Sequence, residues 1–348
     1  MAHAAIQTQR HWHKVFAYSV THFLVDFACA FLMFSSVAST PEGYLCVLLY
    51  NFCAFAMQMP LGIIADRWNQ NVWFAILGCT LVALAYGITH VPIAAVIVVG
   101  IGNAMFHIGG GIDVLNISEK KLGALGVFVS PGAFGIFYGT MAGKGSGFPV
   151  VIIPLVLVAA AALLLVVHNM QRGTYPKNAP FSLDGISTRH VIIAASCLFL
   201  VVCLRSFTGL ALDFSWKSVG FWGTVLACAV VFGKTIGGFV ADRLGVIKTS
   251  LFSLGVAALL FLLPQFPLTG IAAVFFFNMT MPITLWAMAK LFPGAKGFAF
   301  GLLTFGLFLG FLPVYLGTVI PPGGYWLFAI IASASLAILL SGLKRVKE

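Results

Sequence analysis

Three long stretches without any charged residue constrain this chain most strongly. No Asp, Glu, Lys or Arg occurs from Trp68 to Ile112, from Thr249 to Ala289 or from Gly297 to Leu343. Crossing the hydrocarbon core of a bilayer takes about 20 apolar residues, so each stretch is long enough for two membrane helices. Only 8% of all residues are charged, against about a quarter in soluble domains. The chain is therefore predicted to be a polytopic membrane protein.

The pattern of apolar segments predicts an all-α protein with twelve transmembrane helices. They are expected at 14–38, 43–65, 71–89, 92–116, 122–142, 149–169, 190–213, 218–241, 246–264, 267–290, 297–320 and 324–342. The longest polar connection, 171–189, divides them into two sets of six. We expect an N-terminal six-helix bundle over 1–170, a cytoplasmic linker over 171–189 and a C-terminal bundle over 190–348.

The distribution of positive charge predicts the orientation. Most of the 19 Lys and Arg residues fall at helix ends on the side shared by both termini. Positive residues are concentrated in cytoplasmic loops, so both termini are expected in the cytoplasm, with the chain in the plasma (inner) membrane. The net charge of +10 is then explained by the orientation of the chain in the membrane, so we expect no nucleic-acid partner. The lipid bilayer and a small-molecule substrate are the expected partners of a monomer.

Cofactor and metal motifs are missing from the sequence. All seven cysteines lie in apolar segments without a CxxC spacing, which is typical of small buried side chains. No G-x-x-x-x-G-K-[ST] phosphate-binding loop is present. We therefore expect the protein to use no metal, no cofactor and no ATP hydrolysis. A proton gradient is the expected energy source.

A short phrase, G-x-x-A-D-R, occurs twice, about half a chain apart. It runs from Gly62 to Arg67 and again from Gly238 to Arg243. The glycines are expected to allow close helix approach. The aspartates, Asp66 and Asp242, are expected to accept hydrogen bonds from backbone amides at a facing helix N-terminus, while the arginines lie in water. Such contacts would form in one state and break in another, so the six residues Gly62, Asp66, Arg67, Gly238, Asp242 and Arg243 are predicted to act as a conformational gate.

Two further positions suggest that the halves are copies of each other. Gly109, Gly110 and Gly111 are expected to break the helix at 92–116, and Pro282 is expected to break its counterpart at 267–290. Breaks at corresponding places are typical of transporters, where they open the backbone to a cavity. For the glycines alone, close helix packing is the competing interpretation. A proline and glycine cluster beginning at Ser130 predicts a kink in the helix at 122–142.

The repeated phrase resembles the signature loop of the major facilitator superfamily. That resemblance implies twelve helices in two pseudo-symmetric six-helix bundles. In more detail, the sequences Thr21–Asp26, Ala104–His107 and Leu204–Ser206 resemble the fosmidomycin-resistance branch, which implies drug-proton antiport. Here Ile108–Gly111 follows the histidine, where that branch carries Pro-Glu-Gly-Ser.

Ionisable residues inside membrane helices are the candidate functional residues, because a charge there costs about 2.5–3.5 kcal/mol even on the most lenient scale. Asp26 lies near the middle of its helix with His22 four residues earlier, on the same face. A carboxylate beside an imidazole can exchange a proton near neutral pH, which predicts a proton-coupling site. The alternative is a hydrogen-bonded pair that holds two helices together.

Four other residues are candidates for proton coupling or substrate binding. Arg205 must face a partner, which is either Asp26 or an anionic group of the substrate. His107 is either a ligand for substrate or proton, or a structural histidine. Asp113 either replaces the missing acid or pairs with Lys120 or Lys121. Lys234 needs a partner unless its side chain extends to the membrane surface.

These observations favour a secondary active transporter that moves a small organic solute by alternating access. Proton-coupled efflux of the drug-proton antiport type is the first expectation. Uptake or facilitated transport of a small anionic metabolite held by Arg205 is the alternative. A membrane-embedded enzyme is disfavoured, because no paired catalytic set is recognisable, so the chain is not expected to be an enzyme.

Overall fold

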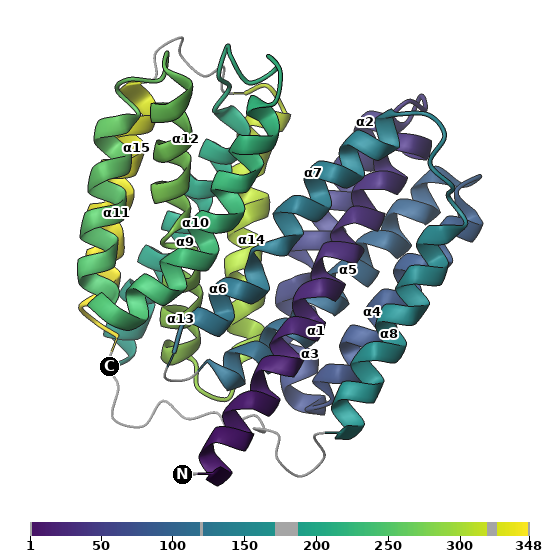
Figure 1. Cartoon of the computed structure of the whole chain (residues 1–348), viewed down its shortest axis with the longest axis horizontal. Coiled ribbons are helices and arrows are strands. Elements are labelled where there is room, and N and C mark those ends of the chain that lie inside the picture. The colour runs from purple at the N-terminus through teal and green to yellow at the C-terminus, as the bar shows by residue number, and fades with distance from the viewer. Residues whose placement is uncertain (1, 119–120, 171–186, 319–325, 347–348) are drawn as a thin grey trace. The chain divides into compact units, whose positions relative to one another are not determined.

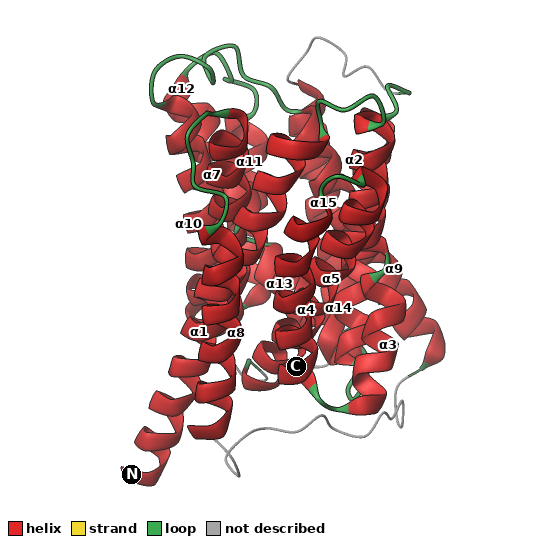
Figure 2. Cartoon of the chain, turned by 90° about the vertical axis from the view of Figure 1, so that its right-hand side faces the viewer, coloured by secondary structure: helices red, strands yellow, loops and turns green. Residues whose placement is uncertain are grey.

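The computed structural model describes residues 2–118, 121–170, 187–318 and 326–346, and within these ranges it contains helices and no strands (Figure 2). The first half is built from α1 (Ala2–Leu32), η1 (Met33–Val37), α2 (Gly43–Asn51), η2 (Phe52–Ala56), α3 (Gln58–Trp68), α4 (Asn71–Ala85), η3 (Tyr86–Ile88), α5 (Pro92–Ile117), α6 (Gly123–Val129), α7 (Pro131–Lys144) and α8 (Ile152–Met170). The second half contains α9 (Thr188–Ala211), α10 (Trp222–Leu244), α11 (Val246–Leu260), α12 (Pro267–Asn278), α13 (Met281–Leu291), α14 (Lys296–Tyr315) and α15 (Trp326–Leu343).

Every expected transmembrane segment is helical. In the described part of the chain, eleven helical stretches are long and apolar enough to cross a membrane, and the shorter apolar helix α11 lies at the twelfth expected position. The chain is therefore an integral, multi-pass membrane protein. The twelve expected helices correspond to more than twelve helical elements, because several spans are interrupted.

The interruptions occur where the sequence weakens helical hydrogen bonding. Pro131 begins α7 directly after Ser130, which separates α6 from α7 as the proline and glycine cluster predicted. Pro282 lies in the first turn of α13, and α12 ends just before it at Asn278. Proline has no N–H to donate, so it is tolerated at a helix start and disrupts a helix interior. The predicted break at Pro282 is confirmed.

The predicted break at Gly109, Gly110 and Gly111 is wrong, since α5 continues through all three glycines. Helix packing explains their presence. A Cβ atom at Gly109 would lie 2.3 Å from the carbonyl oxygen of Asn71, and one at Gly111 would lie 2.6 Å from the ring of Phe300. The glycines therefore serve close contact, which was the competing interpretation.

The residues form two compact units. The first comprises 1–117, 127–179 and 295–301, and the second comprises 118–126, 180–294 and 302–348. Figure 1 shows α1, α4, α5, α7 and α8 of the first unit side by side, in purple to teal. It shows α9 to α13 and α15 of the second unit in green to yellow. Most of the expected linker, 171–186, lies outside the described residues.

A row of glycines on α7 brings it against the backbone of α1. Cβ atoms at Gly135 and Gly139 would lie 2.4 Å from the carbonyl oxygens of Phe23 and Phe27, respectively. Small residues three to four positions apart allow such contact in membrane proteins, where van der Waals packing drives helix association. This approach of α7 to α1 positions the candidate site, because Asp26 lies on the same part of α1.

Candidate functional site

His22 and Asp26 lie one turn apart on α1 and contact each other. The Nε2 atom of His22 is 3.2 Å from Oδ2 of Asp26, and the exposed fractions of the two side chains are 8% and 9%. The spacing of four residues predicted this shared face.

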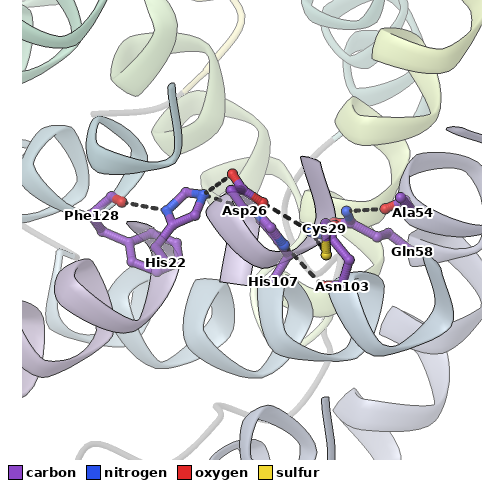
Figure 3. A network of polar contacts seen from close by, with 8 residues as sticks. All are labelled: His22, Asp26, Cys29, Ala54, Gln58, Asn103, His107 and Phe128. Atoms are coloured by element: carbon purple, nitrogen blue, oxygen red, sulfur yellow. Dashed lines mark hydrogen bonds and ion pairs between the residues drawn. The ribbon is translucent and has the colours of Figure 1, made fainter. Parts of the chain in front are cut away.

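His107 from α5 completes a cluster with these two residues (Figure 3). Its Nε2 atom lies 2.9 Å from Nε2 of His22 and 3.7 Å from Oδ1 of Asp26. Its side chain is 11% exposed. Two helices that are far apart in sequence thus bring two imidazoles and one carboxylate together inside the membrane-spanning part of the first unit. We call these three residues the His–Asp–His cluster.

Backbone carbonyls determine the tautomers of both imidazoles. Nδ1 of His22 lies 2.7 Å from the carbonyl oxygen of Phe128, and Nδ1 of His107 lies 2.8 Å from that of Asn103. A carbonyl oxygen can only accept, so both Nδ1 atoms carry hydrogen and donate. In the neutral rings both Nε2 atoms would then face each other with lone pairs. A proton or a metal ion between them would relieve this repulsion at their separation of 2.9 Å.

The break between α6 and α7 makes backbone acceptors available to α1. Pro131 has no N–H for the carbonyl group of Val127, which instead accepts a hydrogen bond of 3.2 Å from the hydroxyl of Ser19. The next carbonyl group, that of Phe128, accepts from His22. Both carbonyl groups lie in the last turn of α6, so the end of this helix supplies the acceptors for two side chains of α1.

Asn103 supports the cluster at two points. Its amide Nδ2 donates to Oδ1 of Asp26 over 2.9 Å and lies 3.5 Å from Sγ of Cys29, while its carbonyl group holds His107. The 103/107 spacing of one helical turn is visible in the sequence. The hydrogen bond from Asn103 to Asp26 is not, because Asp26 belongs to another helix.

Asp113 lies in a second buried polar cluster. Its carboxylate is fully buried, lies 3.1 Å from Nζ of Lys14, and accepts hydrogen bonds from the hydroxyl of Tyr18 and the amide of Asn71. Lys14 is therefore an ion-pair partner of Asp113 that the sequence did not indicate, because the two residues lie on helices far apart in the chain. Of the two lysines expected to pair with Asp113, Lys120 lies outside the described residues, and the pairing with Lys121 stays a prediction.

Arg205 of α9 is buried in the second unit and contacts hydroxyl groups. Its guanidinium donates to Thr280 over 2.7 Å and to Thr284 over 3.3 Å. Its Nε atom has no hydrogen-bond partner among the described residues. Both threonines lie at the α12–α13 break, so the break predicted from Pro282 positions the two groups that hold this arginine. Lys234 lies half-buried on α10, one turn before Gly238, and its role in proton coupling or substrate binding stays a prediction.

The two aspartates of the repeated phrase make equivalent hydrogen bonds. Asp66 accepts from the backbone N–H groups of Gly297 at 2.8 Å and Phe298 at 2.9 Å, in the first turn of α14. Asp242 accepts from those of Leu122 at 2.6 Å and Gly123 at 2.9 Å, where α6 begins. The expected contacts to helix N-termini are present in both copies. Their role as a gate stays a prediction.

The glycines of the phrase lie directly beneath these contacts. A Cβ atom at Gly62 would lie 2.2 Å from the carbonyl oxygen of Gly297, and one at Gly238 would lie 2.7 Å from that of Leu122. Arg67 and Arg243 are exposed, as expected. Asn69 and Gly245, which follow the two arginines at the same interval, both have positive φ, so the two copies end their helices alike.

Sequence comparison identifies no relative: no protein-family model matches, and no curated protein matches. Solved structures do match. The transporter FucP, a member of the major facilitator superfamily seen in the outward conformation, superposes with a TM-score of 0.62 at 13% identity, over 95% of this chain and 100% of that one. The chain has the major facilitator fold.

Two other structures with this fold cover nearly all of the chain. A variant of the E. coli fucose:proton symporter matches 97% of this chain and 98% of its own length, with a TM-score of 0.60 and 14% identity. An outward-facing bacterial homologue of the iron transporter ferroportin, soaked with iron, covers 98% of each chain with a TM-score of 0.61 and 15% identity.

Proposed function

We propose that this protein is a secondary active transporter that works by alternating access and exports a small organic solute in exchange for protons. The single observation that carries the proton coupling is the 2.9 Å separation of the two Nε2 atoms in the His–Asp–His cluster. One proton between them removes the conflict of lone pairs, and the carboxylate of Asp26 balances its charge. A charged group inside a membrane is energetically unfavourable, so its presence there supports a functional role.

Three further features support transport. The fold is shared with proteins whose structures are described as transporters. The doubled aspartate contacts provide bonds that can form in one state and break in another, which biases an equilibrium between two conformations. The chain carries no recognisable catalytic set. We place the protein in the plasma (inner) membrane with both termini in the cytoplasm, because the positive charges favour that orientation.

A second candidate function is the uptake or facilitated transport of a small anionic metabolite. Arg205 favours this function, because its buried guanidinium donates hydrogen bonds to the neutral hydroxyls of Thr280 and Thr284. An arginine in such a position is suited to a carboxylate or phosphate group.

Transport by purified protein in liposomes distinguishes the two. Vesicles are loaded with candidate solutes, and a pH gradient of either direction is imposed. If export is coupled to protons, protons that enter the vesicle through the protein should drive solute out of it. Reversing the pH gradient should then reverse the direction of solute movement. If an anionic solute instead equilibrates at the same rate with and without a pH gradient, and Arg205→Lys stops it, the second function holds.

A further inference from the structure

We propose that the His–Asp–His cluster is also a binding site for a divalent transition-metal ion of the zinc class. The site itself stands apart from the proposed function. The sequence predicted no metal, because the ligands come from two helices and no metal motif joins them.

The spacing of the donor atoms fits such an ion. The three residues each offer one ligand atom, all within 4.8 Å of one another. Nε2 of His22 lies 2.9 Å from Nε2 of His107 and 3.2 Å from Oδ2 of Asp26, and Nε2 of His107 lies 3.7 Å from the other carboxylate oxygen, Oδ1. Zinc binds imidazole nitrogen and carboxylate oxygen at about 2.0–2.2 Å in tetrahedral geometry, which places neighbouring ligands roughly 3.3–3.5 Å apart. The observed separations bracket that value.

The surrounding hydrogen bonds are those of a metal site. A histidine that binds a metal through one nitrogen normally donates its other N–H to a carbonyl or carboxylate, and ligating carboxylates are hydrogen-bonded in turn. Both imidazoles donate Nδ1–H to backbone carbonyl groups, and Asn103 donates to Asp26. Both Nε2 lone pairs and one carboxylate oxygen therefore converge without any rearrangement of the tautomers.

Gly132 packs closely against the donor atoms. A Cβ atom at this position would lie 2.3 Å from Nε2 of His22 and 2.4 Å from Oδ2 of Asp26. Any other residue would therefore displace the two ligands. The cluster supplies three protein ligands, which is the number that holds zinc in sites with a further position for water or substrate.

The donor set selects the class of metal. Imidazole suits Zn²⁺, Fe²⁺, Co²⁺ and Ni²⁺, whereas Mg²⁺ and Ca²⁺ prefer sites made of oxygen alone.

Direct binding in detergent tests the site without requiring transport. Zn²⁺ and Co²⁺ are titrated into the full chain, purified without a histidine tag, and bound metal is measured by equilibrium dialysis and by the visible spectrum of Co²⁺. We expect one ion per chain. We expect the affinity to fall at least about tenfold in His22→Gln, His107→Gln and Asp26→Asn. The matched control is His90→Gln, an exposed histidine in a turn outside the cluster, and it should bind as the wild type does.

Two further measurements guard against variants that fail to fold. Zn²⁺, and not Mg²⁺, should raise the unfolding temperature of the wild-type protein, because ligands that bind only the folded state stabilise it. Gly132→Ala keeps every donor and should still weaken Zn²⁺ binding. Equal binding by wild type and the cluster variants, or an equal thermal effect of Mg²⁺, would overturn the metal site. Binding without any solute-linked proton movement would instead contradict the proposed function and leave the metal site intact.

Discussion

The Nε2 atoms of His22 and His107 lie 2.9 Å apart, on rings whose Nδ1 atoms both donate to backbone carbonyl groups. Neither ring can turn its lone pair away without breaking its bond to a carbonyl group. A cation between the two rings would resolve this conflict, and Oδ2 of Asp26 lies 3.2 Å from Nε2 of His22 to balance its charge.

Replacing either histidine of the cluster with glutamine should remove the pH dependence of transport. A coupling site must load and release a proton in each cycle, and imidazole is the side chain suited to that exchange. The wild-type exchange rate, measured at equal pH on both sides of the vesicle, should therefore depend on pH. His22→Gln and His107→Gln should give slower exchange with a flat profile. A variant with an unchanged profile would show that the cluster is structural.

Asp66→Asn and Asp242→Asn should each weaken the state in which the aspartate contacts form. Asparagine can accept only one of the two backbone N–H bonds, and a hydrogen bond to a charged group contributes about 1.5–3 kcal/mol. That corresponds to roughly a tenfold to hundredfold change in the conformational equilibrium constant. Exchange rates should fall while solute affinity at equilibrium changes little. Asp213→Asn, at a side chain that is 84% exposed, is the matched control and should leave both quantities unchanged.

Gly62→Ala and Gly255→Ala should change thermal stability in opposite directions. A methyl group at Gly62 would meet the carbonyl oxygen of Gly297 at 2.2 Å, whereas nothing lies within 4 Å of the Cβ position at Gly255 on α11. Overpacking costs about 1–3 kcal/mol, and alanine in an open helical position is favoured by about 1 kcal/mol over glycine. Unfolding in detergent, followed by circular dichroism, should show a lower midpoint for Gly62→Ala and an equal or higher one for Gly255→Ala. A higher midpoint for Gly62→Ala would refute the close contact.

Removing one charge from the buried pair of Lys14 and Asp113 should destabilise the protein more than removing both. A buried charge left without its partner costs about 3–5 kcal/mol. Lys14→Met and Asp113→Asn should therefore each lower the unfolding midpoint strongly, while the double variant recovers part of the loss. Additive losses in this double-mutant cycle would mean that the two side chains, 3.1 Å apart, do not interact energetically.

Local sequence patterns predicted much of the fold and the pairing of two of the three residues in the cluster. Runs of apolar residues gave the twelve spans, and the spacing of four residues placed His22 beside Asp26. The repeated G-x-x-A-D-R phrase indicated the contacts of Asp66 and Asp242, because its chemistry requires backbone donors. In each case the residues of one helix, or of the repeated phrase, are sufficient for the prediction.

Contacts between distant segments were the part that could not be predicted. His107 joins Asp26 only because α5 and α1 pack together, and Lys14 reaches Asp113 for the same reason. The triple glycine at Gly109 was misinterpreted as a break, since glycine in a helix serves close packing as readily as flexibility. The carbonyl group that orients His22 belongs to Phe128 at the end of α6, and nothing in the sequence links that residue to α1.

Proton movement linked to solute tests the proposed coupling most directly. Purified wild-type protein and Asp26→Asn are placed in liposomes that contain a pH dye, and candidate solutes are added one at a time. We predict that a transported solute produces proton movement with the wild type and none with Asp26→Asn, because the shared proton loses its counter-charge. Equal solute transport by both proteins, without any proton signal, would contradict proton coupling and leave Asp26 with a structural role.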